Sequence, residues 1–274
     1  MITSPIPVDA LSLDDVSARL VEARYRREHL IVSGLNAAVF NLAATDSRLA
    51  ANLRRADLVI PDGVGVVWGW RLFGARIPER VATPDLVDHF LAVSPGIRVF
   101  VLGADEDCNA SAAKTLTMAG ARVVGRHSGF WSPGDEQSLL TWIGSRDPEL
   151  ILLGLPSPMK EELAQKIVKT APHAIVIGVG GYLDILAGKT QRAPEWASRL
   201  GLEWLYRLMQ EPHRLARRYL AGNALFLLRL VRCTTLQRRS RANRREWIRP
   251  TFSFDSFGCE SQHKHCESNS EEPL

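Results

Sequence analysis

Residues 176–228 read VIGVGGYLDILAGKTQRAPEWASRLGLEWLYRLMQEPHRLARRYLAGNALFLL. The segment starts as an apolar run, breaks at Gly178-Val-Gly-Gly181, and continues through Asp184 into stretches rich in Trp, Tyr and Arg. Glycine has no Cβ, so backbone amides at such a turn can approach a ligand closely. The turn therefore predicts an anion-binding site, with a tight strand-to-helix corner as the alternative. The basic and aromatic residues behind it favour an anionic, partly apolar substrate.

Short apolar runs alternate with helical patterns along the preceding residues. This alternation predicts an α/β fold, namely a Rossmann-like, mainly parallel sheet with helices on both faces. Ligands of such sheets bind beyond the carboxyl ends of the strands. The expected strands span 29–33, 57–60, 98–102, 122–124, 149–153 and 174–179. The polar residues expected at their carboxyl ends are Asn36, Asp62, Asp105, Lys160 and Asp184.

The composition of the 274 residues changes along the chain. We assign residues 1–199 to an α/β catalytic core, 200–248 to a basic amphipathic helical appendage, and 249–274 to a polar tail that we expect to be disordered. Within the appendage, residues 213–239 predict an amphipathic helix or helix pair. The apolar side of this element is expected to carry Leu215, Tyr219, Leu220, Leu225, Phe226 and Leu230.

The positive charge gathers in one part of the chain. The formal net charge is +4, yet residues 207–249 are rich in arginine and contain no lysine. Such a segment fits a nucleic acid, an anionic membrane face or a pyrophosphate lipid. Because no nucleic-acid-binding motif accompanies it, we expect no nucleic acid partner. The four sparse cysteines indicate a reducing compartment, and no apolar run approaches the roughly 20 residues that span a bilayer.

Three polar residues at the expected strand ends each have two interpretations. Asp62 lies in Pro-Asp-Gly-Val-Gly, where a rigid carboxylate suits a general base, although the local sequence favours a helix N-cap. Asn36 either caps its helix or binds the hydroxyls of a ligand. Asp184 either caps a helix or accepts hydrogen bonds from a sugar or a uracil ring. The glycine turn lacks the G-x-G-x-x-G spacing, which disfavours a nicotinamide-dependent enzyme.

Several motifs resemble the WecG/TagA/CpsF family of glycosyltransferases (glycosyltransferase family 26). The match covers roughly residues 30–240. It rests on VGGYLDILAG, RAP-W, GLEWLYRL and EP-R---RY in the segment quoted above, on AD-V-PDGVGVVW at 56–68 with Asn36 upstream, and on LILLGLPSPMKE at 150–161.

The resemblance implies an inverting transfer of a sugar from a UDP-sugar to a polyprenyl-diphosphate-linked acceptor. It implies no metal or other cofactor, and a peripheral location on the cytoplasmic face of the plasma membrane, an anionic surface. It casts Asp62 as the catalytic base. We assign the nucleotide-sugar pocket to Asn36, Gly178, Gly180, Gly181, Asp184, Lys160 and Glu161. We assign the acceptor diphosphate to Arg192, Arg207, Arg214 and Arg217, and leave a homo-oligomer open.

This chain departs from the family pattern at three positions. Gly34 stands where the family usually has Thr, Thr83 stands where Gly is expected, and Lys160 replaces a neutral amide. A lysine there favours an acidic sugar or holds a phosphate, so the donor sugar stays open. The alternative function is a catalytically degenerate scaffold that binds the membrane surface.

Overall fold

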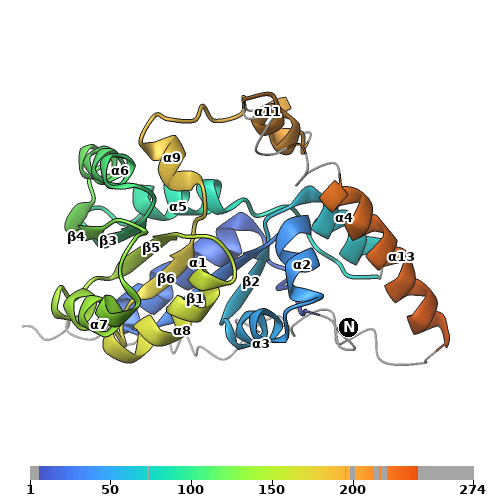
Figure 1. Cartoon of the computed structure of the whole chain (residues 1–274), viewed down its shortest axis with the longest axis horizontal. Helices are drawn as coiled ribbons and strands as arrows, with labels where there is room; N and C mark the ends of the chain where they lie inside the picture. Colours follow the sequence, from blue (N-terminus) through green and yellow to red (C-terminus); the bar gives the residue numbers. More distant parts are fainter. Residues whose placement is uncertain are drawn as a thin grey trace, which may run out of the picture.

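Six parallel strands form a single sheet in the order β2-β1-β6-β5-β3-β4. The computed structural model describes residues 6–72, 74–194, 196–197, 201–210, 212, 216 and 221–239, and Figure 1 shows its arrangement. The strands are β1 (Leu30–Leu35), β2 (Leu58–Pro61), β3 (Arg98–Gly103), β4 (Arg122–His127), β5 (Leu150–Gly154) and β6 (Ile175–Gly178). Every strand pair is parallel, so the predicted α/β sheet is confirmed.

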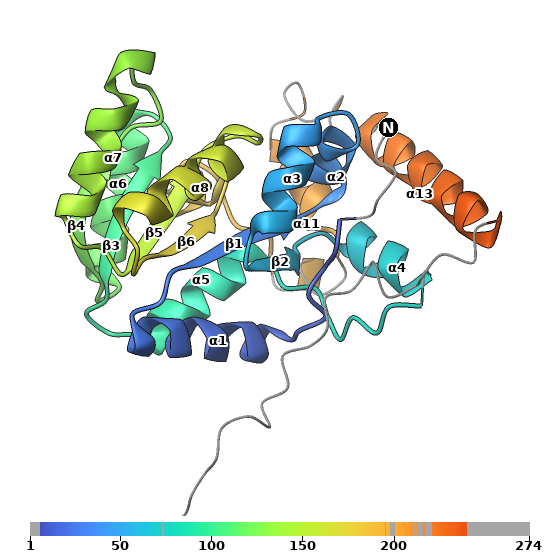
Figure 2. The same cartoon turned by 90° about the horizontal axis from the view of Figure 1, so that it is seen from below.

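Helices cover both faces of the sheet, as the alternating pattern predicts. Helices α1 and α5 lie on the opposite side from α3 and α8 (Figure 2). One face carries α1 (Leu13–Arg26), α5 (Thr83–Ala92), α6 (Glu106–Met118) and α9 (Tyr182–Leu186). The other carries α2 (Ala37–Ala43), α3 (Ser47–Arg55), α4 (Val64–Leu72), α7 (Glu136–Ser145), preceded by the short 3-10 helix η1 (Pro133–Asp135), and α8 (Met159–Thr170).

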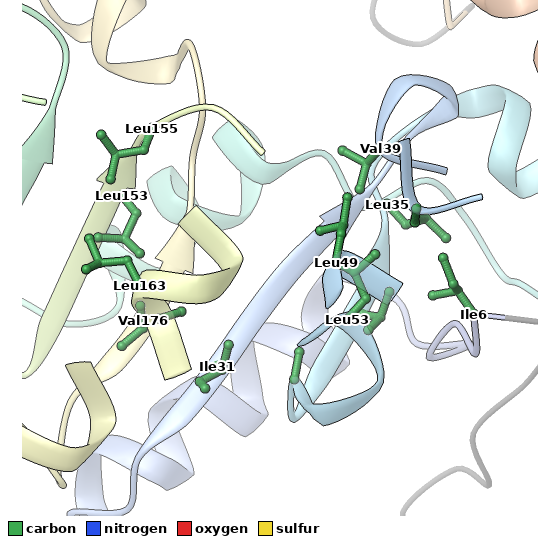
Figure 3. Packing of buried hydrophobic residues seen from close by; sticks show 14 of the residues in the cluster. Ile6, Ile31, Leu35, Val39, Leu49, Leu53, Leu153, Leu155, Leu163 and Val176 are labelled. Atoms are coloured by element: carbon green, nitrogen blue, oxygen red, sulfur yellow. The ribbon is translucent and has the colours of Figure 1, made fainter. Parts of the chain in front are cut away.

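The strands are largely apolar, apart from the edge strand β4, because both of their faces are buried. Successive side chains of a strand point to opposite faces, so Ile31 joins the core beneath α3 and α8 while Leu30 and Val32 join the core beneath α1 and α5. Figure 3 shows Leu163 of α8 beside Leu153 and Val176 of the sheet.

Short polar side chains at several strand ends start the next helix. Asn36 caps α2 directly after β1, and Asp105 caps α6 after β3. Both are residue types that accept hydrogen bonds from the free amides of a first helical turn. The chain therefore reverses within a few residues of each of these strands, which brings the polar residues to one edge of the sheet.

Two described helices belong to the C-terminal part of the chain: α11 (Glu203–Gln210) and α13 (Gly222–Arg239). Helix α13 packs against α2 and α4 (Figure 1), and its Phe226 and Leu230 are only 2% and 6% exposed. These two side chains lie over Gly65 and Gly69 of α4.

The residues predicted on the apolar side of the appendage differ in burial. Phe226 and Leu230 pack against the core, whereas Leu225 is 42% exposed. It precedes Phe226 by one residue, and neighbours in a helix point about 100° apart. Leu215, Tyr219, Leu220 and the tail after residue 239 lie outside the described residues. Within the described ranges, no helix has both the length and the apolar character needed to cross a bilayer.

The ends of β3 and β5 lie in close contact at Gly103, and a substitution there tests this contact. The φ of Gly103 is 134°, and a Cβ there would overlap the carbonyl group of Gly154 and lie 2.7 Å from that residue's Cα. We predict that Gly103→Ala lowers the free energy of unfolding by about 3 kcal/mol, because both the φ angle and the backbone contact oppose a side chain.

Urea unfolding of the purified chain measures this change. The matched control is Gly134→Ala, since a Cβ at Gly134 meets nothing within 4 Å. Equal stability of the two variants would contradict the observed approach of β3 and β5.

Candidate active site

A cleft of about 860 Å³ opens at the carboxyl ends of the strands. Its walls come from the segments that follow β1, β2, β3, β5 and β6, and from parts of α11 and α13. Its volume lies in the range of small-molecule sites. Four of the five residues expected at the strand ends line it: Asn36, Asp62, Lys160 and Asp184. Asp105, the fifth, caps α6 outside this cleft and pairs with Lys189 at 3.0 Å.

Asp62 is held from two sides at the end of β2. Its Oδ1 accepts hydrogen bonds from the backbone amide of Thr83 at 2.9 Å and from the Thr83 hydroxyl at 3.2 Å. Its Oδ2 accepts one from Nδ2 of Asn36 at 3.3 Å. The helix cap favoured by the local sequence is therefore wrong. The carboxylate bonds across the site, while the amides of Val66 and Val67 in α4 donate to the carbonyl of Gly63.

Asn36 caps α2 and also donates to Asp62, so its cap interpretation is confirmed, while ligand binding by this residue stays a prediction. Its Oδ1 accepts from the amides of Ala38 and Val39, each at 3.1 Å, and so caps α2. With the oxygen committed to the helix, the NH₂ group of the same amide faces Asp62. The cap thus fixes which end of the side chain meets the carboxylate.

Lys160 and Glu161 form a buried cluster with Ser157. The Lys160 ammonium donates to Ser157 Oγ at 2.6 Å and lies 3.0 Å from Glu161 Oε1, which also accepts from Ser157 at 2.7 Å. The side chains of Lys160 and Glu161 are 11% and 2% exposed. Lys160 reaches the cleft, whereas Glu161 lies behind it. The charge of Lys160 is largely balanced by Glu161 before any ligand arrives.

The glycine turn is attached to the sheet. The amides of Val179 and Gly180 donate to the carbonyl of Leu153 at 3.0 and 3.3 Å, so these two amides serve the strand-to-helix corner. A Cβ on Gly178 would lie 3.0 Å from Cε of Lys160, so this glycine makes room for the lysine stem. Gly178, Gly180 and Gly181 all line the cleft.

Asp184 lies inside α9, where Gly181 occupies the N-cap position. The helix-cap interpretation of Asp184 is therefore wrong. Its Oδ1 accepts from the thiol of Cys108 at 3.4 Å. Burial, together with this hydrogen bond to Asp184, raises the pKa of Cys108 to about 11, so the thiol stays neutral near pH 7. Asp184 faces the cleft with a neutral donor behind it.

The arginines assigned to the acceptor diphosphate are only partly described. Arg192 forms ion pairs with Asp85 and with Asp88, the latter at 2.5 Å, and Asp88 also accepts from the hydroxyl of Tyr182. It does not line the cleft. Arg207 lies on α11, but its side chain is outside the described part of the chain. Arg214 and Arg217 lie outside the described residues. These four assignments stay predictions.

Two cleft residues that the sequence analysis did not assign to the site are Arg80, which links α11 to the core, and Thr83, which contacts Asp62. Arg80, 18% exposed, pairs with Glu203 of α11 at 3.0 Å. Thr83, which follows Arg80 by three residues, is 4% exposed and contacts Asp62. The signal in the sequence is the segment Arg80-Val-Ala-Thr-Pro-Asp-Leu86, in which Thr83 departs from the glycine that the family pattern expects.

Two of the departures from the family pattern lie against each other. A Cβ added to Gly34 would lie 2.9 Å from Thr83 Oγ1 and 3.1 Å from Cβ of Asp62. The Thr83 side chain therefore occupies the space beside Gly34, next to the carboxylate.

A comparison with protein-family models shows to which family the chain belongs. The model described as "Glycosyl transferase WecG/TagA/CpsF family" matches residues 3–241. The chain belongs to this family. Its class is thus a glycosyltransferase of cell-surface polysaccharide synthesis, and the resemblance carried by the motifs of residues 30–240 is confirmed.

The buried Lys160–Glu161 pair gives a stability prediction. We expect Lys160→Met to lower the free energy of unfolding by about 3 kcal/mol, because it leaves a buried carboxylate without its cation. Replacing both residues, as Lys160→Met with Glu161→Gln, should recover most of the loss.

Chemical denaturation compares these variants with Lys166→Met on the same helix. Lys166 pairs with Glu136 at 2.5 Å but is 47% exposed, and exposed pairs contribute at most about 1 kcal/mol. If Lys160→Met is as stable as Lys166→Met, the buried Lys160–Glu161 pair contributes no more to the free energy of unfolding than an exposed pair does.

Proposed function

We propose that this chain transfers a sugar from a UDP-sugar to a polyprenyl-diphosphate-linked saccharide, with inversion at the anomeric carbon. Asp62 acts as the general base. The acceptor oxygen bonds to the anomeric carbon, its proton passes to Asp62, and the bond from that carbon to UDP breaks with its electron pair leaving on UDP. No metal or other cofactor takes part in this scheme.

The observation that carries the proposal is the setting of Asp62. Its carboxylate lines a cleft large enough for a nucleotide-sugar, and it is fixed by Thr83 and Asn36 rather than by its own helix. A general base must be within hydrogen-bond reach of the proton that it takes and must hold its orientation. A carboxylate used only as a helix cap would not need partners at the starts of two other helices, α2 and α5.

We place the donor on the far side of the cleft from α4. Asp184, Lys160 and the segment 178–181 line that side. The amides of Val179 and Gly180 are committed to Leu153, so side chains carry more of the binding there than the glycine turn alone suggests. Because Lys160 is paired with Glu161, we expect it to hold a hydroxyl or a phosphate oxygen rather than to select an acidic sugar.

We place the acceptor diphosphate near α11 and the residues that follow it. Arg207, Arg214 and Arg217 are the proposed ligands, because arginine binds phosphate groups bidentately. Arg192 joins this set only if the diphosphate competes with Asp85 and Asp88. Arg80, which lines the cleft beside Glu203, is a further arginine within reach of departing UDP. Cationic side chains would offset the charge that develops on UDP.

The proposal includes a peripheral position on an anionic membrane at its cytoplasmic face. Helix α13 exposes Leu227, Leu228 and Val231 by 61%, 63% and 60%. Helix α4, which packs against α13, exposes Trp68 and Leu72 by 68% and 81%. Apolar side chains next to basic ones support a helix that lies in a membrane interface.

Asp62→Asn tests the role of the base. We expect this variant to fold and to bind UDP, measured by calorimetry, while turnover falls by at least about a hundredfold because the amide cannot take the proton. Turnover is followed as radiolabel moving from a panel of UDP-sugars into the lipid fraction of added membranes. Asp14→Asn, an exposed change on α1, is the matched control.

Near-normal turnover in Asp62→Asn would refute the assignment of the base. If the unaltered chain moves no label from any UDP-sugar and releases no UDP, the scaffold alternative is favoured instead. In that case the protein should still bind vesicles.

The exposed face of α13 gives a second prediction. Leu227→Glu together with Leu228→Glu should weaken binding to vesicles of anionic phospholipid by at least about tenfold, because charged side chains lose the apolar contribution. Flotation of vesicles measures this. Met118→Glu, 73% exposed on α6, should leave binding unchanged, and equal binding by all variants would exclude α13 from the membrane contact.

A further inference from the structure

We infer that Thr83 is a positioning residue for Asp62, and that its hydroxyl keeps one carboxylate oxygen fixed so that the other is presented to the acceptor. This inference rests on the proposed role of Asp62 as the base. It concerns a position at which this chain departs from the usual family pattern.

The two oxygens of Asp62 are treated differently. Oδ1 receives two hydrogen bonds, from the amide and the hydroxyl of Thr83 at 2.9 and 3.2 Å. Oδ2 receives one longer bond, 3.3 Å from Asn36. A carboxylate oxygen accepts about two hydrogen bonds, so Oδ1 is occupied and Oδ2 retains capacity. Oδ2 is therefore the atom that takes the acceptor proton.

Thr83 is itself held rigidly. Its side chain is 4% exposed, and its branched Cβ restricts rotation about χ1. It begins α5 and precedes Pro84, which fixes the local backbone. Two residues earlier, the amide of Val81 donates to the carbonyl of Pro61 at 3.2 Å. Two hydrogen bonds therefore join the segment at the start of α5 to the end of β2, one from Val81 to Pro61 and one from the Thr83 amide to Asp62.

Gly34 on β1 forms the opposite wall of this arrangement. An added Cβ would lie 2.9 Å from Thr83 Oγ1 and 3.1 Å from Asp62 Cβ, so one of these atoms would have to move. Space for the Thr83 hydroxyl beside Asp62 therefore depends on the missing side chain at position 34. A methyl group at position 34 should push the hydroxyl away from Oδ1.

The experiment measures steady-state kinetics of the full chain with whichever of UDP-glucose, UDP-N-acetylglucosamine or UDP-glucuronic acid supports label transfer into membrane lipid. Thr83→Val keeps the shape but removes the hydroxyl. We expect kcat to fall about 10–100-fold, the size of a lost hydrogen bond to a charged group. The KM for the donor should change less than about twofold, because the donor does not touch Thr83 in this account.

Three further variants separate positioning from general stability. Thr83→Ser restores the hydroxyl and should keep kcat within about threefold of the parent. Thr170→Val removes a hydroxyl that donates to Ile167 at the far end of α8, and should leave kcat unchanged. Gly34→Ala should lower kcat, and its loss should not add to that of Thr83→Val, because both act on one hydrogen bond.

The outcomes distinguish this inference from the proposed function. If Asp62→Asn stops turnover but Thr83→Val does not lower kcat, only the positioning role is refuted. It is also refuted if Thr83→Ser is as slow as Thr83→Val, or if the Gly34→Ala and Thr83→Val losses multiply in the double variant. If Asp62→Asn retains turnover, the role of Asp62 as the base is refuted, and the positioning role of Thr83 is refuted with it.

Discussion

The site depends on one carboxylate that its own helix does not hold. Asp62 directly follows β2, yet its oxygens bond to Thr83 at the start of α5 and to Asn36 at the start of α2. These three residues come from separate connections of the chain, and the parallel sheet brings them to one edge. A glycosyl transfer by direct displacement needs such a fixed base next to an open cleft.

The sheet and the C-terminal helices contribute different parts of the cleft. The strand ends supply the polar residues, while α11 and α13 close one side. Helix α11 does so through the Arg80–Glu203 ion pair, and α13 through Phe226 and Leu230, which lie over α4. Because α4 begins at Val64, two residues after Asp62, the helix on which α13 packs is also the helix next to the carboxylate. Because residues of α13 line the cleft, binding of α13 to a membrane would place one wall of the active site at the membrane surface.

The sequence predicts the sheet, its two helical layers and the edge on which the site lies, because apolar runs and parallel connections are local patterns. Asn36, Asp62 and Asp184 could be placed at the cleft for the same reason. What could not be predicted depends on side chains that meet across the fold. Nothing local shows that Thr83 binds Asp62, that Glu161 neutralises Lys160, or that Arg192 pairs with Asp85 and Asp88. Local propensity accordingly favoured a helix cap at Asp62.

A crystal structure of the full chain with UDP is the most direct test of the central claim that the cleft around Asp62 is the catalytic centre. The account predicts UDP inside the cleft, on the side lined by Asp184, Lys160 and the segment 178–181, with the Asp62 carboxylate across the cleft open to the acceptor and the Thr83 bonds to Oδ1 intact. UDP bound outside the cleft, or with its phosphates directed away from Asp62, would contradict the account.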